Sequence, residues 1–258
     1  MTDTDAPLAD VVAEARRVVG AAAAQDVTMR VLGGTGVALH DHRAVPDSLN
    51  RTYGDIDVVV PAKATRATSA VLVASGYVPN ERFNALHGAK RMLFYDNRNG
   101  RQLDVFVGVF AMCHELELGR RLGRHHQALG AADLLLTKLQ IAEINHKDVV
   151  DAVRIVLTHD VVDTDTDDDT LSLQRLRAVT SGDWGWYTTF TDNLETVRTA
   201  VPELLEPDLA GPVLFRFDGL RTALDSAPKS MRWRARSIIG RKSPWYELPE
   251  EVDREAAR

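Results

Sequence analysis

Two aspartates, Asp55 and Asp57, stand one residue apart at the start of the apolar run Val58-Val59-Val60. The run predicts a β-strand that ends at Pro61. Side chains alternate along a strand, so both carboxylates project to the same side and repel each other unless a divalent cation lies between them. Because Mg²⁺ is typically bound by one or two carboxylates plus substrate phosphates, the pair predicts a Mg²⁺ or Mn²⁺ site. Such pairs are also common at exposed strand ends.

A glycine-rich turn, Gly33-Gly34-Thr35, follows a short apolar segment at residues 27–32 that reads as a buried strand. Residues 36–41 look like the start of a helix. Glycines let the backbone approach a ligand closely, and exposed N–H groups at a helix start favour phosphate. The turn is therefore a candidate phosphate-binding loop, and it is equally compatible with an ordinary strand-to-helix connection.

A third carboxylate, Asp104, lies within a second apolar run at residues 103–109, which we predict to be a strand. A buried aspartate is unfavourable unless it is paired or bound to a metal. If this strand lies beside the strand at residues 55–60, then Asp55, Asp57 and Asp104 converge. Three converging carboxylates are the arrangement used in two-metal phosphoryl transfer.

These parts together resemble the DNA polymerase β-type nucleotidyltransferases, whose signature is Gly-Gly or Gly-Ser after a strand, then Asp-x-Asp, then a third acid on a later strand. The resemblance covers residues 31–106. Two departures stand out: the common Gly-Ser is Gly34-Thr35 here, and the stretch from Gly34 to Asp55 is longer than in minimal members. The lead-in Arg51-Thr52-Tyr53-Gly54 resembles one branch, the AbiEii-type abortive-infection proteins, several of which are toxins of toxin–antitoxin pairs.

The second half carries further features of that branch, in which a helix with a lysine precedes a helix with Arg/Lys-Asp-x-x-Asp. The matching positions here are Lys138, then Lys147, Asp148 and Asp151. The resemblance implies that Lys138 contacts a triphosphate and that Asp148 orients Lys138 or a substrate group. Lys147 and Asp151 are weaker candidates. It also places Arg51 with Gly33, Gly34, Thr35 and Lys138 among the nucleotide-binding residues. Solvated helix positions would explain Asp148 and Asp151 equally simply.

The resemblance implies an enzyme that transfers a nucleoside monophosphate from an NTP such as ATP to an acceptor hydroxyl. Asp55 and Asp57 would hold the metal, and Asp104 would share in metal binding and deprotonate or position the hydroxyl. The acceptor would be tRNA in a toxin-like member, with a cognate antitoxin as a partner. A small aminoglycoside-type acceptor is one alternative. A degenerate fold that only binds a nucleotide or a partner protein is another.

The elements that must position these residues follow from apolar periodicity. The spacing predicts a helix at residues 8–24, a loop at 42–51, a helix at 64–75, and two strands at 91–95 and 103–109 joined by a hairpin turn at Asn97–Gly100. Helices are predicted at 131–143 and 149–157, and helical spacing continues from residue 171. The fold class is therefore α/β (α+β): a mixed sheet flanked by helices, then an all-helical C-terminal half.

We place the boundary near residues 112–130, with residues 1–115 as the catalytic domain and 116–258 as a helical domain that completes the cleft. A chain of 258 residues with 45% hydrophobic and 26% charged residues is typical of a globular protein. A net charge of −6 argues against a uniformly basic nucleic-acid coat. One cysteine, a polar N-terminus and no long apolar run predict a cytoplasmic protein with no membrane segment.

Several other features have simpler interpretations. Cys113 reads as a structural residue, the acidic run at residues 160–169 as a solvated loop, and His125-His126 as a loop without zinc spacing. Trp184 and Trp186 are expected to pack in the helical half. The basic, tryptophan-containing segment Arg232–Arg236 could bind tRNA or another polynucleotide, although such segments are more often solvated helix faces.

Overall fold

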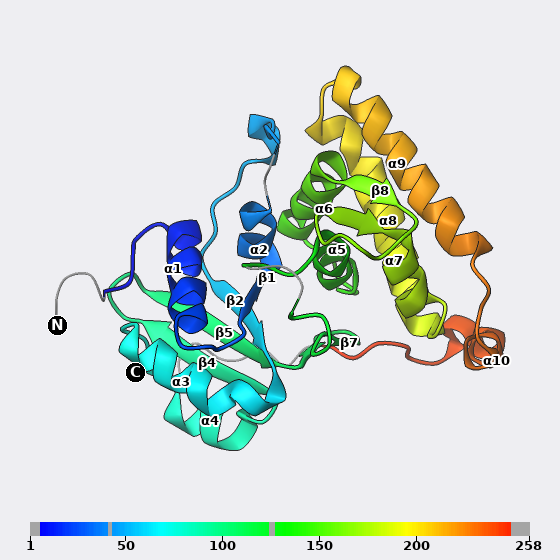
Figure 1. Ribbon diagram of the computed structural model, residues 1–258. Coiled ribbons are helices and arrows are strands. Elements are labelled where there is room, and N and C mark those ends of the chain that lie inside the picture. Colours follow the sequence, from blue (N-terminus) through cyan, green and yellow to red (C-terminus); the bar gives the residue numbers. More distant parts are fainter. Residues whose placement is uncertain (1–5, 41–42, 124–126, 249–258) are drawn as a thin grey trace.

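The computed structural model describes residues 6–40, 43–123 and 127–248 (Figure 1). Its N-terminal half begins with a helix and builds one sheet with helices interspersed. The elements are α1 (Val11–Ala23), β1 (Arg30–Leu32), α2 (Gly33–Leu39), η2 (Asp47–Leu49), β2 (Ile56–Val60), η3 (Ala62–Ala64), α3 (Thr65–Ala74), β3 (Val78–Pro79), α4 (Glu81–His87), β4 (Arg91–Asp96), β5 (Arg101–Val107), β6 (Val109–Ala111) and β7 (Glu115–Glu117).

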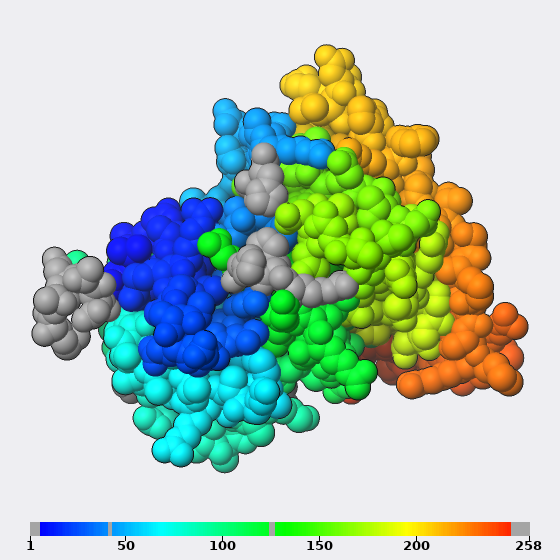
Figure 2. All heavy atoms as spheres, viewed as in Figure 1, coloured from blue at the N-terminus to red at the C-terminus, as the bar shows by residue number. Residues whose placement is uncertain are grey.

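The C-terminal half is built mainly of helices, which lie against the N-terminal half (Figures 1 and 2). Its elements are α5 (Ala131–Leu139), α6 (His146–Thr158), β8 (Asp160–Val162), β9 (Thr170–Ser172), α7 (Leu173–Thr180), α8 (Trp184–Leu204), α9 (Pro207–Ser226), α10 (Met231–Ile239) and η4 (Gly240–Lys242). The predicted mixed α/β fold with a helical C-terminal half is confirmed. None of the helices among the described residues is long and apolar enough to cross a membrane.

The five-stranded sheet has the order β1-β2-β5-β4-β3. Strands β2 and β5 are parallel, whereas the other neighbouring pairs are antiparallel. The predicted hairpin is confirmed: β4 pairs with β5 from Arg91 opposite Phe106 to Asp96 opposite Arg101. Gly100 in the turn has φ +65°, a conformation that glycine adopts without strain.

The two faces of the sheet bury different sets of side chains because strand residues alternate sides. Ile56, Val58 and Val60 of β2 pack with α1 and α3 in one apolar cluster. Val59 of β2 belongs to a second cluster, which contains the buried side chains of α5, α6, α8 and α9. Asp57 alternates in the same way as Val59, so it lies on the sheet face that looks toward the helical half.

The helical half is also joined to the sheet through the backbone. Val31 of β1 donates to the carbonyl of Gln127 and accepts from the N–H of Leu129, at 2.8 and 2.9 Å. Residues 127–129 thus add a short parallel bridge along the outer edge of β1. Helix α5 starts two residues later, so this connection fixes where α5 meets the sheet.

Several elements differ from the sequence prediction. The strand expected at residues 27–32 is only β1, and the helix expected from residue 36 begins at Gly33. Short elements were not predicted at all: β3, α4, β6 and β7 lie in segments too short for a clear period. The acidic run at 160–169 is not simply a solvated loop, because Asp160 starts β8 and Asp165 binds Arg121 at 2.8 Å. His125 and His126 lie outside the described residues.

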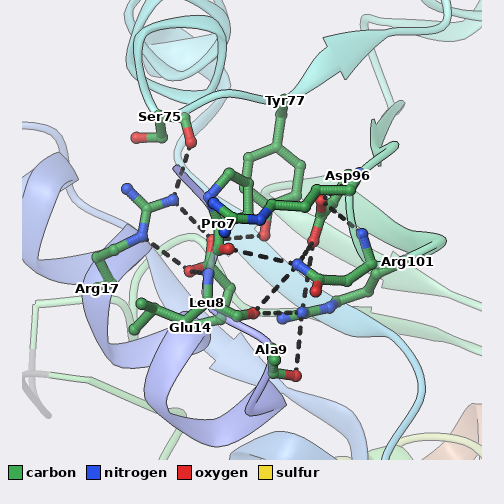
Figure 3. A network of polar contacts seen from close by, with 11 residues as sticks. Pro7, Leu8, Ala9, Glu14, Arg17, Ser75, Tyr77, Asp96 and Arg101 are labelled. Atoms are coloured by element: carbon green, nitrogen blue, oxygen red, sulfur yellow. Dashed lines mark hydrogen bonds and ion pairs between the residues drawn. The ribbon is translucent and has the colours of Figure 1, made fainter. Parts of the chain in front are cut away.

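A buried polar network ties α1 to the sheet (Figure 3). Glu14 is fully buried and accepts hydrogen bonds from the N–H of Leu8 (2.9 Å), the guanidinium of Arg17 (2.8 Å) and the hydroxyl of Tyr77 (2.8 Å). Arg17 also donates to the carbonyl of Ser75 at 2.8 Å. A buried carboxylate is tolerated only when its oxygens are satisfied, which they are here. The network therefore fixes α1 against the segment between α3 and β3.

We expect Glu14→Gln to lower the free energy of unfolding by about 2–3 kcal/mol, because Arg17 loses its charge partner inside the protein. Urea unfolding followed by circular dichroism measures this change. Glu81→Gln, at an exposed position in the first turn of α4, is the matched control. Equal unfolding midpoints for the two variants would show that the network contributes nothing to stability.

Candidate active site

The glycine turn is built against the aspartate pair. Gly33 has φ +64°, and a Cβ placed on it would collide with the carboxylate of Asp57. A Cβ on Gly34 would overlap the guanidinium of Arg51. Both glycines are therefore required by close approach, and Gly33 also by its conformation. Thr35 is buried and its hydroxyl donates to the carbonyl of Asp55 at 3.1 Å, so Thr35 positions the strand that carries the pair.

The three predicted acids come together on neighbouring strands. Asp57 of β2 is in register with Asp104 of β5 in the parallel pair, and with Leu32 of β1 on its other side. Asp55 lies one residue before β2. Adjacent strands are about 4.8 Å apart, so the Asp57 and Asp104 carboxylates project side by side from one face. The expectation that the two strands are neighbours is confirmed.

Crowding of these acids changes their proton affinity. Burial, the nearby Asp104 carboxylate and Asp55 together raise the pKa of Asp57 to about 7, against the opposing charges of Lys138 and Arg91. Burial also raises the pKa of Asp104, although Arg91 and Gln102 favour its charged form. The site thus holds more negative charge than its own cations balance, which favours an added cation.

Asp104 already has protein partners. Its Oδ1 accepts from Arg91 Nε at 2.8 Å, and its Oδ2 accepts from Gln102 at 2.6 Å. Sequence reasoning missed both partners. The hairpin could have revealed Arg91, because a turn at residues 97–100 places it opposite Phe106 and on the same face as Asp104. Gln102 lies on that face as well, two residues before Asp104 on the same strand.

A second charged cluster faces the acids from the helical half. Lys138 of α5 is buried, and its Nζ lies 2.8 Å from both Asp148 Oδ1 and Asp151 Oδ2 of α6. Burial alone would lower the pKa of Lys138, but the two carboxylates outweigh it and raise the pKa, so this lysine stays charged. The predicted pairing of Lys138 with Asp148 is therefore present.

Asp151 is the centre of this cluster, although sequence analysis ranked it below Asp148 as a candidate. Its side chain is fully buried and accepts two hydrogen bonds from Arg51, at 2.8 and 2.6 Å. Arg51 in turn stacks over the Tyr53 ring at 4.3 Å, and Tyr53 accepts from Arg154 at 2.8 Å. The predicted residue Arg51 thus connects the glycine turn to α6. Lys147 is exposed in the first turn of α6, and within the part of the chain that the structure describes it forms no hydrogen bond or ion pair with this cluster.

The acids suit a divalent cation that is shared with a substrate. Among the described residues, no group of three or more His, Cys, Asp or Glu side chains is arranged to hold a metal ion. Asp104 is already held by Arg91 and Gln102, so Asp55 and Asp57 are the acids to consider for the cation. Two carboxylates completed by substrate phosphates are a usual set of ligands for Mg²⁺. The raised pKa of Asp57 agrees with such a fit.

The raised pKa of Asp57 has a consequence for stability. Between pH 4 and pH 7 the folded protein holds a proton on Asp57 that the unfolded chain has released, so this group destabilises the fold as pH rises. We expect Asp57→Asn to raise the free energy of unfolding by about 1–3 kcal/mol at pH 8 and to have little effect at pH 4. Urea unfolding at the two pH values, without divalent ions, measures it; a variant less stable than the native protein at pH 8 would contradict the expectation.

The buried Asp151 should matter more to folding than Asp148. Asp151→Asn leaves Arg51 and Lys138 without their shared buried carboxylate, and we expect a loss of about 3 kcal/mol in the free energy of unfolding. Asp148→Asn removes a partly exposed carboxylate and should cost about 1 kcal/mol. Thermal unfolding of both variants under one condition compares them. Equal losses of unfolding free energy in the two variants would contradict the larger contribution that we expect from Asp151.

Comparison with known proteins agrees with this geometry. No curated protein matches the chain. The family described as uncharacterised nucleotidyltransferase matches residues 9–150, which include the glycine turn, the three strand acids, Lys138 and Asp148. That match covers more than half of the 258 residues. The chain therefore belongs to the uncharacterised nucleotidyltransferase family.

Proposed function

We propose that the protein transfers a nucleoside monophosphate from an NTP to an acceptor hydroxyl in a Mg²⁺-dependent reaction. The observation that carries the proposal is the register of Asp57 with Asp104 on the parallel pair β2–β5, with Asp55 beside them. Nucleotidyl transfer is the activity of the family. The excess negative charge at these acids supports the metal dependence.

Each residue has a distinct task in this proposal. Asp55 and Asp57 would hold Mg²⁺, or Mn²⁺ in its place. When bound, the ion would neutralise phosphate charge as the transition state forms. Lys138 faces the acids closely enough to affect Asp57, and its ammonium would bind the triphosphate. Asp148 would orient Lys138 through their 2.8 Å contact.

Asp104 suits the proton transfer. Its raised pKa makes it a better base than an ordinary aspartate, and Arg91 and Gln102 fix its orientation. The acceptor oxygen would form a bond to the α-phosphorus as the bond to pyrophosphate breaks, and Asp104 would take the acceptor proton. The backbone of Gly33 and Gly34 would give the triphosphate room beside Asp57.

The acceptor hydroxyl is a separate part of the proposal. The AbiEii-type resemblance stays a prediction, and it makes tRNA the first acceptor to test. If the resemblance holds, the protein would also be toxic and would have a cognate antitoxin. A small aminoglycoside-type molecule is the alternative acceptor. A protein that binds NTP without transferring it would be the degenerate case.

The test uses each of the four NTPs labelled at the α-phosphate, with Mg²⁺ and total RNA or a set of aminoglycosides. We expect the native protein to transfer label and Asp57→Asn to lose at least about 100-fold in rate. Asp26→Asn, at an exposed position with φ 56°, is the matched control and should retain full activity. EDTA should abolish transfer, and added Mg²⁺ should restore it.

Two results would overturn the proposal. One is transfer by Asp57→Asn at the native rate. The other is a native protein that neither transfers label nor binds any NTP with Mg²⁺. If the native protein binds NTP but transfers label to neither acceptor class, a protein that only binds the nucleotide would be the better account of the site.

A further inference from the structure

A large cavity lies away from the acids, where the C-terminal segment returns to the sheet half. Its volume is about 1110 Å³, and it is enclosed by the β6–β7 turn, the start of α8, α10 and residues 244–247. The N–H of Glu247 donates to the carbonyl of Cys113 at 3.1 Å, which attaches the returning segment to the β6–β7 turn. Figure 1 shows this segment running from α10 back toward β7.

The cavity presents aromatic rings that are not fully covered by the protein. Trp184, Trp245 and Tyr246 are each half-buried. Trp245 lies edge-on to Trp184 at 6.0 Å and to Tyr246 at 5.3 Å. Arg236 lies over one face of Trp184 and Arg241 over one face of Trp245, so the remaining ring surfaces are the ones on which nucleobases can stack, whatever their sequence. Trp186, also in the lining, is buried in the helical core and confirms the packing predicted for it.

The cavity lining is close to neutral, whereas the segment beside it is basic. The lining has three acids and three cations, which makes the interior close to neutral: Glu115, Asp183, Glu247, Lys90, Arg232 and Arg236. The neighbouring segment, residues 229–243, forms a basic rim: beyond Arg232 and Arg236 it adds four cations, Lys229, Arg234, Arg241 and Lys242, and it contains no acid. Among the described residues, Arg234 and Lys242 of that segment are exposed, lie outside the cavity lining and form no ion pair. A neutral aromatic interior beside a basic rim matches bases beside phosphates.

Helix α10 lies on the surface, where a ligand can reach its charged side chains. It has no buried residue, and it forms an edge of the molecule (Figures 1 and 2). Arg236, by contrast, serves the structure: it donates to the carbonyls of Gly240, Ser243 and Pro244 and lies over the Trp184 ring at 4.8 Å. The cations available for phosphates are therefore the outer ones.

The cavity is within reach of the acids. Asp104 lies on β5, and Ala111 at the cavity is seven residues further along the chain, so the two are no more than about 23 Å apart at ~3.3 Å per residue. Lys90 of the lining precedes Arg91, which binds Asp104. A strand of about seven stacked nucleotides, at ~3.4 Å each, spans the largest such distance.

We propose that this cavity and the basic rim of α10 bind a single-stranded polynucleotide and present its terminal hydroxyl toward Asp104. The presentation of the hydroxyl depends on the function proposed above, whereas the binding itself does not. The outer cations contact phosphates, and Trp184, Trp245 and Tyr246 contact bases.

The first test measures binding of a fluorescently labelled single-stranded RNA of twelve nucleotides by anisotropy, beside DNA of the same sequence. We expect the double variant Arg234→Glu/Lys242→Glu to bind at least tenfold more weakly, and the salt dependence of the affinity to fall by about two units of slope. The control Arg66→Glu/Arg82→Glu reverses two exposed charges on α3 and α4 and should bind within twofold of the native protein. A stronger binding of RNA than of DNA would show that the 2′-hydroxyl is read.

The second test addresses stacking. Tyr246→Ala should weaken binding about fivefold or more, and Tyr246→Phe should restore it, because the ring and not the hydroxyl makes the contact. Circular dichroism and a thermal midpoint within the native range would show that Tyr246→Ala is folded. Native affinity in Tyr246→Ala and in the double charge variant would overturn the proposal. So would stronger binding to vesicles of anionic phospholipid than to either nucleic acid, given the exposed Met231, Ile238 and Ile239 on α10.

Failure of this proposal and failure of the transferase proposal are distinguishable. Asp57→Asn should bind the RNA as the native protein does, and Arg234→Glu/Lys242→Glu should bind NTP with Mg²⁺ as the native protein does. RNA binding by a protein that does not bind NTP would support the cavity and reject the transferase. NTP binding and transfer to a small molecule, without RNA binding, would reject the cavity alone.

Discussion

The carboxylate of Asp151 is the constraint on which the rest of the site depends. It is fully buried on α6 and accepts from both Lys138 of α5 and Arg51 of the segment before β2. A lone carboxylate in this position would be strongly unfavourable, so the folded state requires both cations. Arg51 also occupies the space beside Gly34, which makes the glycine turn part of the same arrangement. Parts of the chain 100 residues apart in the sequence, the segment before β2 and the α5–α6 pair, are therefore brought together by one charge.

On the sheet side of the site, the negative charges are not fully offset by nearby cations, in contrast to Asp151. Asp57 and Asp104 are forced side by side by the strand register, and the cations near them do not fully compensate their charges. A fold chosen for stability alone would place apolar residues there, as it does at Val59 and Phe106 on the same face. Functional sites commonly keep such unfavourable groups at the expense of stability. The apolar cluster around the site supplies the compensation.

The sequence predicted the site better than it predicted the shorter elements around it. The Asp-x-Asp spacing and the apolar runs predicted one strand at Asp57 and another at Asp104, because a period of two and an Asn-Gly turn are strong local signals. That the two strands are neighbours was only a condition of the prediction, and the parallel pairing of β2 with β5 meets it. The weight given to Asp148 over Asp151 could not be corrected from sequence, since burial depends on how α6 meets α5. The hairpin β6–β7 and the pair β8–β9 have three residues in each strand, which is too few for a pattern. Their existence depends on tertiary contacts.

The edges of the sheet have a consequence for how copies of the protein meet one another. On one side, residues 127–129 cover β1 with backbone hydrogen bonds. On the other side, the edge strand β3 is only two residues long and ends at Pro79, whose nitrogen cannot donate. An exposed, long and regular edge would act as a template for another strand and so for aggregation. Both borders of this sheet are therefore protected against that, so copies of the protein that meet in solution do not extend one another's sheet.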